Sequence, residues 1–258
     1  MAELMDAYWR APAIARTFST AILASSIGIY MGVLPGQWFW FHHSRLLTIP
    51  PEIWRPVTAF FLTDPGLGII MDTYFVFQYL SQLENGHPKF TRKEDLLWYL
   101  MFVGIVIIIL CDTLLGVGWF LRPLILALCY TATQDQRGVK AGFFLFTVPA
   151  QLIPYCMLLV TLLMQGPYAF QVQLTGLVAA HLYDFLTRIY PEFGGGPNLI
   201  PTPGFLSRLV STPRVFQRDY GTAIRNNAGA SSGRSTGVAG SGPLPDSWKT
   251  RGRGHRLG

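Results

Sequence analysis

Few side chains in this sequence have the type and spacing that catalysis would need. His181 lies in a long apolar stretch, where a histidine can act as general base for a nucleophile on a neighbouring helix. A serine nucleophile is missing, because no serine occurs from Gln82 to Leu206 and no Gly-x-Ser-Gly occurs in the apolar part. Cys129 remains, but nothing near it in the sequence would lower its pKa. The sequence therefore predicts no enzyme, with an active intramembrane protease as the alternative.

Metal and cofactor chemistry are also unsupported. The three cysteines, Cys111, Cys129 and Cys156, lie inside apolar runs at spacings that fit neither a disulfide framework nor a zinc site. The histidines are scattered. We predict neither a metal nor a cofactor.

A second alternative comes from polar residues inside apolar stretches. Such residues usually face a bundle interior or a water-filled cavity, because a charge in hydrocarbon costs at least about 2.5 kcal/mol. A small-solute transporter would use them as an ion site, but no inverted repeat is visible. The residues concerned are Asp72, Gln78, Gln151, Gln171, Gln173 and Asp184.

The composition identifies the environment of these residues. Of 258 residues, 50% are hydrophobic and 13% are charged, whereas a soluble domain has about a quarter charged residues. Gaps between charges predict an all-α membrane protein with six spans, although the fourth is short for a span that needs about 20 residues. The expected spans are Phe18–Leu34, Gly66–Leu83, Leu96–Leu115, Leu124–Thr133, and two within Ala141–Tyr183 that are divided at Gln165–Pro167.

The positive-inside rule gives the orientation. If both termini face the cytosol, most Lys and Arg residues fall on that side, and only Arg45, Arg55 and Arg122 lie opposite. The opposite side then holds an aromatic-rich loop from Pro35 to about Pro65, which we expect in the membrane interface.

Composition divides the chain into three parts. Residues 1–16 should form a cytosolic interfacial segment, with a helix over Leu4–Arg16, and residues 17–190 the membrane domain. Residues 191–258 hold nine Lys and Arg against three Asp and Glu, which accounts for the whole formal charge of +6. We expect a short basic helix over Gly204–Arg218 and a disordered Gly/Ser-rich tail after it.

His181 also has a structural interpretation. Gly176 and Ala180 form a small-xxx-small pair, which lets a neighbouring helix approach closely. A histidine beside such a contact can hydrogen-bond to the neighbouring span, and we favour this role over contact with a substrate.

Several segments together resemble the derlin family of rhomboid-like pseudoproteases. Trp54-Arg55 resembles its Trp-Arg motif in the first luminal loop, and Gln78-Tyr79 the end of its second span. Gly176 to Tyr183 resembles its Gly-x-x-x-Gly-His-x-Tyr motif, with Ala180 replacing the second glycine. Tyr190-Pro191 and Thr202-Pro203 resemble its exit into the cytosol. The C-terminal end resembles its SHP box through Gly252, Gly254, Arg256 and Leu257, without the usual preceding aromatic residue.

The resemblance implies a fold, a function, a cellular location and a set of partners. The fold is a six-transmembrane-helix rhomboid-like bundle with a disordered cytosolic C-terminal tail. The function is non-catalytic work in endoplasmic-reticulum-associated degradation, in which misfolded proteins are retrotranslocated from the endoplasmic reticulum membrane. Implied partners are a RING ubiquitin ligase complex, misfolded clients and, through the SHP-like box, the AAA+ ATPase valosin-containing protein. The Arg-Gly alternation after Arg251 also fits RNA binding, but one short run is weak support, so no nucleic acid partner is expected.

Overall fold

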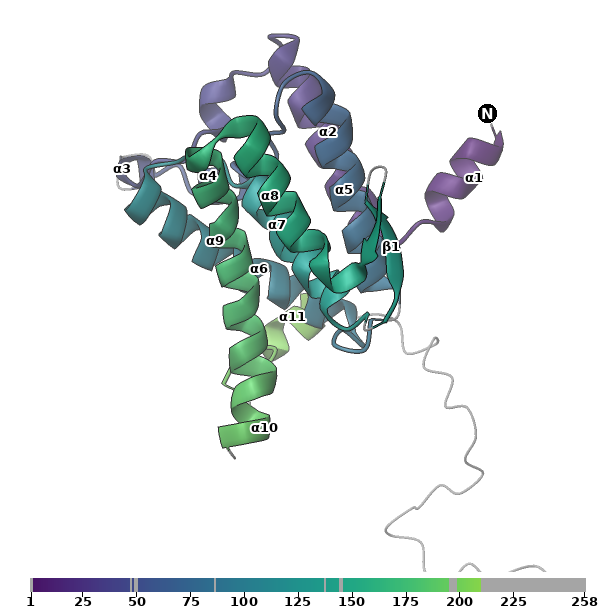
Figure 1. Cartoon of the computed structure of the whole chain (residues 1–258). Coiled ribbons are helices and arrows are strands. Elements are labelled where there is room, and N and C mark those ends of the chain that lie inside the picture. Colours follow the sequence, from purple (N-terminus) through teal and green to yellow (C-terminus); the bar gives the residue numbers. More distant parts are fainter. Residues whose placement is uncertain are drawn as a thin grey trace, which may run out of the picture. The chain divides into compact units, whose positions relative to one another are not determined.

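The computed structural model describes residues 2–46, 48, 51–85, 87–136, 138–143, 146–194 and 199–209 (Figure 1). All of them belong to one unit, Met1–Thr212. Its elements in chain order are α1 (Ala2–Arg10), α2 (Ala13–Tyr30), η1 (Gly36–Phe39), α3 (His43–Leu46), α4 (Arg55–Thr58), α5 (Leu67–Glu84), α6 (Lys93–Leu110), η2 (Cys111–Leu115), α7 (Leu121–Gln134), β1 (Lys140–Phe143), β2 (Phe146–Pro149), η3 (Ala150–Leu152), α8 (Ile153–Gln165), α9 (Pro167–Asp184), η4 (Phe185–Ile189), α10 (Tyr190–Gly194) and α11 (Gly204–Leu209).

The long helices α2, α5, α6, α7, α8 and α9 alternate in direction. Glu84, at the end of α5, accepts hydrogen bonds from backbone N–H groups at the start of α2. Arg122, at the start of α7, donates to Gln165 at the end of α8. Lys89, just before α6, pairs with Asp184 at the end of α9. We call the two sides of the bundle the Arg122 end and the Lys89 end.

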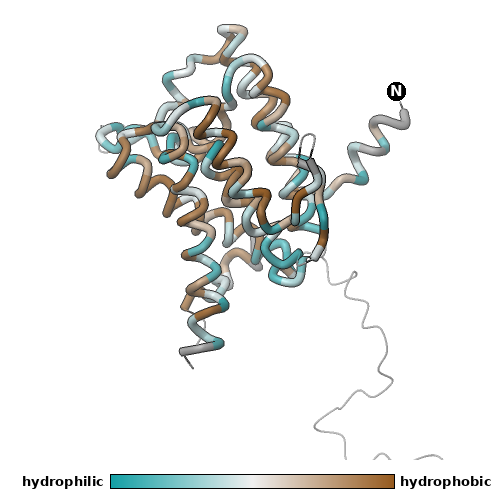
Figure 2. Tube along the Cα trace, viewed as in Figure 1, coloured by the Kyte–Doolittle hydropathy of each residue, from teal (hydrophilic) through white to brown (hydrophobic). Residues whose placement is uncertain are grey.

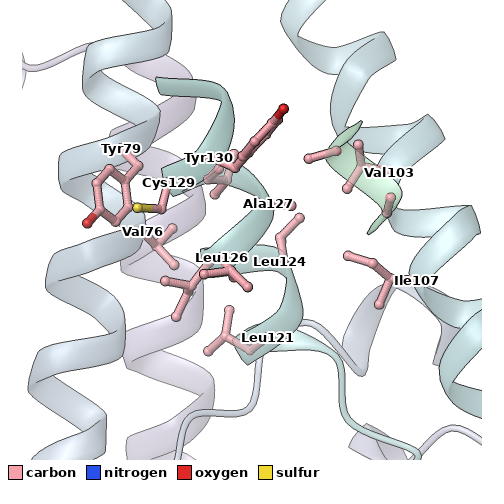
Figure 3. Close-up of a cluster of buried hydrophobic side chains, with 14 of the residues drawn as sticks. Val76, Tyr79, Val103, Ile107, Leu121, Leu124, Leu126, Ala127, Cys129 and Tyr130 are labelled. Carbon is pink, nitrogen blue, oxygen red and sulfur yellow. The ribbon is translucent and has the colours of Figure 1, made fainter. Parts of the chain in front are cut away.

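Helix α7 is the centre of the bundle. It contacts α5, α6, α8 and α9, and every residue from Pro123 to Thr133 is buried. Figure 3 shows its side chains between Val76 and Tyr79 of α5 on one side and Val103 and Ile107 of α6 on the other. Its 14 residues span roughly 21 Å, less than the hydrocarbon thickness of about 30 Å. The predicted fourth span is therefore short because other helices, and not lipid, surround it.

The outer helices carry apolar residues on their exposed faces. Along α6 and α8 the chain is mainly hydrophobic, whereas the connection between α5 and α6 is hydrophilic (Figure 2). Large exposed side chains include Ile105 and Ile109 on α6 and Leu159 and Leu163 on α8. Within the described residues, Ala13–Tyr30 and Lys93–Leu115 are long and apolar enough to cross a membrane by length and composition. An apolar outer surface is what lipid contact requires.

The prediction of helix from Ala141 onward is wrong. Lys140–Phe143 and Phe146–Pro149 form a two-stranded antiparallel sheet, with Gly142 opposite Thr147, so the described part of the chain is mostly helical and not all-α. A helix here would contain Gly142 and Pro149, which cost about 1 and about 3 kcal/mol relative to alanine. The helix that follows, α8, begins only at Ile153.

The N-terminal helix is also divided differently from the prediction. The expected helix over Leu4–Arg16 is interrupted after Arg10, and α2 begins at Ala13 with Pro12 as its N-cap residue. A residue that precedes proline avoids the α conformation, which explains the break at Ala11. Of the basic helix predicted over Gly204–Arg218, the described part is α11, which ends at Leu209.

Candidate functional site

The candidate site is a groove beside α5. Three adjoining hollows, of about 370, 380 and 510 Å³, follow this helix from the Arg122 end to the Lys89 end. The first two share Met71 and Phe75, and the second and third share Gln78, Gln82 and Gln136. Helix α8 and the β1–β2 hairpin contribute to the opposite wall, and α7 to the floor. We call this feature the lateral groove; it extends roughly 27 Å along α5 by helical rise.

At the Arg122 end the groove contains polar groups held inside the bundle. Asp72 is 8% exposed, and its carboxylate accepts the Asp64 backbone N–H at 3.1 Å. Gln173 on α9 is 5% exposed, and its Oε1 has no hydrogen-bond partner among the described residues. Both residues line the 370 Å³ hollow beside apolar Met157 of α8. The hollow therefore combines apolar walls with two buried polar side chains, and the Gln173 oxygen has no hydrogen-bond partner among the described residues.

At the Lys89 end the lining becomes polar. Ser81 Oγ and Gln82 Oε1 are buried and have no hydrogen-bond partner among the described residues, and His87 Nε2 lies 3.8 Å from Asp135 Oδ2. All three residues line the 510 Å³ hollow, together with Asp135. Burial lowers the pKa of His87, because desolvation penalises the charged imidazolium.

Ion pairs surround this end of the groove. Lys89 Nζ lies 2.8 Å from Asp184 Oδ1 and 3.6 Å from Asp135 Oδ2. Arg188 donates to Asp135 Oδ1 at 2.9 Å. These pairs hold the loop between α5 and α6 to the ends of α7 and α9, so they fix the position of the groove's polar rim.

The predicted motif residues Trp54 and Arg55 lie at the other end of the bundle. Arg55 is 6% exposed, and one guanidinium nitrogen donates to the carbonyl oxygens of Gln37 at 2.5 Å and Trp40 at 2.6 Å. Its Nε pairs with Glu52, and this hydrogen bond lowers the pKa of the Glu52 carboxyl. Trp54 is 46% exposed. Arg55 therefore fixes the loop before α4 through backbone carbonyls, whereas Trp54 projects outward.

The predicted close contact at Gly176 is present. A Cβ at Gly176 would lie 1.8 Å from the Pro123 carbonyl oxygen, so only glycine permits this approach of α9 to α7. Ala180 is 1% exposed in the same interface. His181 is exposed, and its Nδ1 is 2.9 Å from the Tyr130 hydroxyl on α7. The expected hydrogen bond between neighbouring helices is thus found, at the edge of the interface.

The structure separates Cys129 from His181. Cys129 points toward Tyr79 of α5, whereas the next side chain, Tyr130, points away from it on α7 (Figure 3) and bonds His181. A thiolate–imidazole pair needs its two side chains in hydrogen-bond contact. These two residues therefore do not form such a pair in this arrangement.

Of the remaining predicted site residues, one is described by the structure and four are not. Gln78 is exposed on α5 and lines the groove. The SHP-like residues lie outside the described part of the chain; they are Gly252, Gly254, Arg256 and Leu257.

Comparison with known proteins agrees with this architecture. The model of the Der1-like family matches residues 11–204, which include the whole bundle. The chain belongs to the Der1-like family. Derlin-1 of Homo sapiens is 30% identical over 227 residues, covering 86% of this chain and 88% of the relative. Derlin-2 of Oryza sativa subsp. japonica is 26% identical over 256 residues, covering 94% and 99%. Derlin-1 of Drosophila melanogaster is 26% identical over 214 residues, covering 80% and 85%.

The suspected family is thereby confirmed. Membership in the Der1-like family implies a protein of the endoplasmic reticulum membrane with a role in endoplasmic-reticulum-associated degradation.

Sequence reasoning missed most of the groove in this Der1-like chain. Asp72, Gln78 and Gln173 were singled out as polar residues at membrane depth, but Ser81, Gln82 and His87 were not. A signal existed, because the residues on the α5 wall recur at intervals of four, three, four and three, which is one helix face. These residues are Met71, Phe75, Gln78, Gln82 and Asn85.

Proposed function

We propose that this chain is a non-catalytic component of endoplasmic-reticulum-associated degradation that helps misfolded proteins to cross or leave the membrane. The observation that carries the proposal is the lateral groove. It places polar, partly unpartnered side chains beside helices whose outer faces are apolar. Such a surface gives a polypeptide a path that is neither pure hydrocarbon nor water.

The physical argument concerns the polypeptide backbone. Each peptide group that enters hydrocarbon without a hydrogen-bond partner costs several kcal/mol. Asp72, Gln173 and Gln82 offer such partners along the groove. Facilitation is then passive, and the pulling force comes from outside the membrane domain.

The proposed topology has six spans and both termini in the cytosol. The alternating directions of α2, α5, α6, α7, α8 and α9 support six crossings. The Lys89 end has Lys89, Lys93 and Arg188 near the helix ends, so the positive-inside rule assigns this end to the cytosol. The Arg122 end then faces the lumen, and the groove opens toward the cytosol at its polar rim.

The proposed partners follow from the family resemblance of the tail and the membrane body. A RING ubiquitin ligase complex would modify clients, and an AAA+ ATPase related to valosin-containing protein would bind the SHP-like residues Gly252–Leu257. An extended tail of this kind can add as a strand to a partner domain, with Leu257 as apolar anchor. Leu257→Ala should therefore weaken ATPase capture more than Arg251→Ala at physiological salt.

A groove mutation tests the function directly. Asp72→Leu combined with Gln173→Leu removes two polar groups from the groove while keeping side-chain volume. We expect the half-life of a misfolded membrane client to rise several-fold in cells that depend on this chain. Gln171→Leu is the matched control, because this exposed glutamine lies two residues from Gln173 on α9 but does not line a hollow of the groove. Unchanged client turnover in the double variant, at equal protein level, would refute the role of the groove.

A further inference from the structure

One edge of the β1–β2 hairpin has backbone groups that bond to none of the described residues. Antiparallel strands direct the N–H and C=O groups of alternate residues toward and away from each other. Val139 accepts the Ala150 N–H at 2.9 Å, and the register continues with Ala141 opposite Val148. Odd-numbered residues of β1 therefore bond to β2, and Lys140 and Gly142 direct their backbone groups to the other side. No described element bonds to those groups.

This free edge of β1 faces the lateral groove. Ala141 and Gly142 line the 380 Å³ hollow, and Gln78 and Gln82 of α5 line it with them. A Cβ built at Gly142 would have no neighbour within 4 Å, so the space over this face of the strand is open. An unpaired strand edge is a template for another extended chain.

The adjoining hollow supplies further hydrogen-bond partners. His87 Nδ1 accepts the Lys89 backbone N–H at 3.3 Å, and its Nε2 lies 3.8 Å from Asp135 Oδ2, so His87 is held within the chain at the rim of this hollow. Gln82 Oε1 can accept a hydrogen bond, and Ser81 Oγ can donate or accept one. The Ser81 and Gln82 oxygens have no hydrogen-bond partner among the described residues. A peptide backbone offers the alternating donors and acceptors that would satisfy them.

We propose that the free edge of β1 binds an extended segment of a client polypeptide as a third strand, with the polar wall of α5 on its other side. The inference rests on the proposed function and names the ligand of the groove at the Lys89 end. Recognition uses Gly142 and Lys140 backbone groups together with the Ser81 and Gln82 side chains.

The chemistry of the site selects an unfolded polypeptide over a charged small ligand. The partners that face the 380 Å³ hollow are backbone groups and uncharged amides, which discriminate little between side chains. The carboxylate at the rim, Asp135, is already paired with Arg188 and Lys89, and it would repel an anion. β1 has four residues, so few strand bonds can form and binding should be weak and reversible. A chain that moves past the edge needs such weak binding.

The test uses a probe whose backbone alone is changed. A fluorescent 15-residue peptide of alternating Thr and Val is titrated onto the full-length protein in lipid nanodiscs, and the same peptide with alternate backbone nitrogens methylated serves as comparison. Methylation removes donors on one strand edge but keeps every side chain. We expect about thirtyfold weaker binding of the methylated peptide, which corresponds to two lost hydrogen bonds.

Two proline variants locate the contact. Gly142→Pro removes an N–H that faces the groove, and Thr147→Pro removes an N–H on the outer edge of the same hairpin, directly opposite in the register. Neither position bonds within the hairpin, so both variants should keep its internal bonds. We expect Gly142→Pro to weaken peptide binding at least tenfold and Thr147→Pro to leave it unchanged.

Each outcome either supports or overturns strand addition. Equal binding of the two peptides overturns it without any mutation, and so does equal binding by the two proline variants or no binding by the unmodified protein. A peptide copied from residues 213–258 that binds more tightly than the probe would assign the edge to the chain's own tail and overturn the client assignment. Client half-life, measured in parallel, reports on the proposed function separately, because the groove can serve clients without a strand contact.

Discussion

The two sides of α7 are packed in opposite ways. Toward α9 the helices touch backbone to backbone, because Gly176 lies against the Pro123 carbonyl and Ala180 is fully covered. Toward α5 and α8 the chain leaves hollows of about 370 and 380 Å³, with Asp72 and Gln78 on the α5 wall. We call the first region the closed interface and contrast it with the lateral groove.

The difference shows how one bundle can be stable and still hold an opening. Small residues let α7 and α9 approach closely, so the closed interface gains van der Waals contacts. Such contacts stabilise helix packing in lipid, where burial of apolar surface gives no driving force. Larger and polar residues keep the groove walls apart, at the expense of unpartnered atoms such as Gln173 Oε1. Stability should therefore respond to changes in the closed interface, and function to changes in the groove.

The largest effect on stability is expected at the closed interface. Gly176→Ala places a methyl group 1.8 Å from a backbone oxygen, which forces α9 away from α7 and should destabilise the fold by about 3 kcal/mol. Gly104→Ala is the control, because its new Cβ would meet Phe60 at an ordinary 3.5 Å. Unfolding in detergent micelles measures both, and equal stability of the two variants would contradict the packing argument.

The next effect concerns the ion pairs at the Lys89 end, where the closed interface and the groove meet. A double-mutant cycle with Lys89→Ala and Asp184→Ala should give a coupling energy of about 1–2 kcal/mol, since the pair is 2.8 Å apart and largely covered. The pair of Arg188 with Glu192, at 4.0 Å and exposed, should couple by less than about 0.5 kcal/mol. Similar couplings for both pairs would mean that burial does not strengthen the first.

A smaller effect on stability is expected in the groove, where the substitution should stabilise the fold or leave its stability unchanged. Gln173→Leu removes a buried oxygen that has no partner among the described residues, so unfolding free energy should stay the same or rise by up to about 1 kcal/mol. Unfolding measured beside Gly176→Ala gives the contrast. A loss of more than about 1 kcal/mol would indicate that Gln173 holds the bundle together, contrary to the comparison.

The smallest effect is a pH dependence at the groove rim. Burial lowers the pKa of His87, while the unfolded imidazole protonates near its ordinary value of about 6.5. The stability that neutral His87 contributes is therefore complete above that pH and is lost as the pH falls below it. Lys89 opposes protonation and Asp135 favours it. His87→Gln should flatten the stability profile between pH 7 and 5; a profile identical to that of the unmodified protein would exclude His87 as its source.

Local sequence was sufficient for the long helices and for one contact. Charge gaps located α2, α5, α6 and α9, each 18 residues long, because a long stretch with few charged residues can form a continuous helix with an apolar surface. The Gly176–Ala180 spacing predicted a close approach on one helix face. Residues 140–149 were misread because lack of charge does not distinguish a helix from a hairpin, and Gly142 and Pro149 were given too little weight.

The sequence by itself determined the class of the molecule: apolar segments, basic connections and a set of motifs similar to the derlin family. Only the tertiary structure decided which polar residues meet. Lys89 pairs with Asp184 across 95 positions of sequence, and Tyr130 bonds His181 across 51. Helical periodicity fixes which residues share a face, but not which face meets which helix. The groove depends on which helix faces meet, because a hollow needs two walls and the sequence pattern of one helix predicts only one of them.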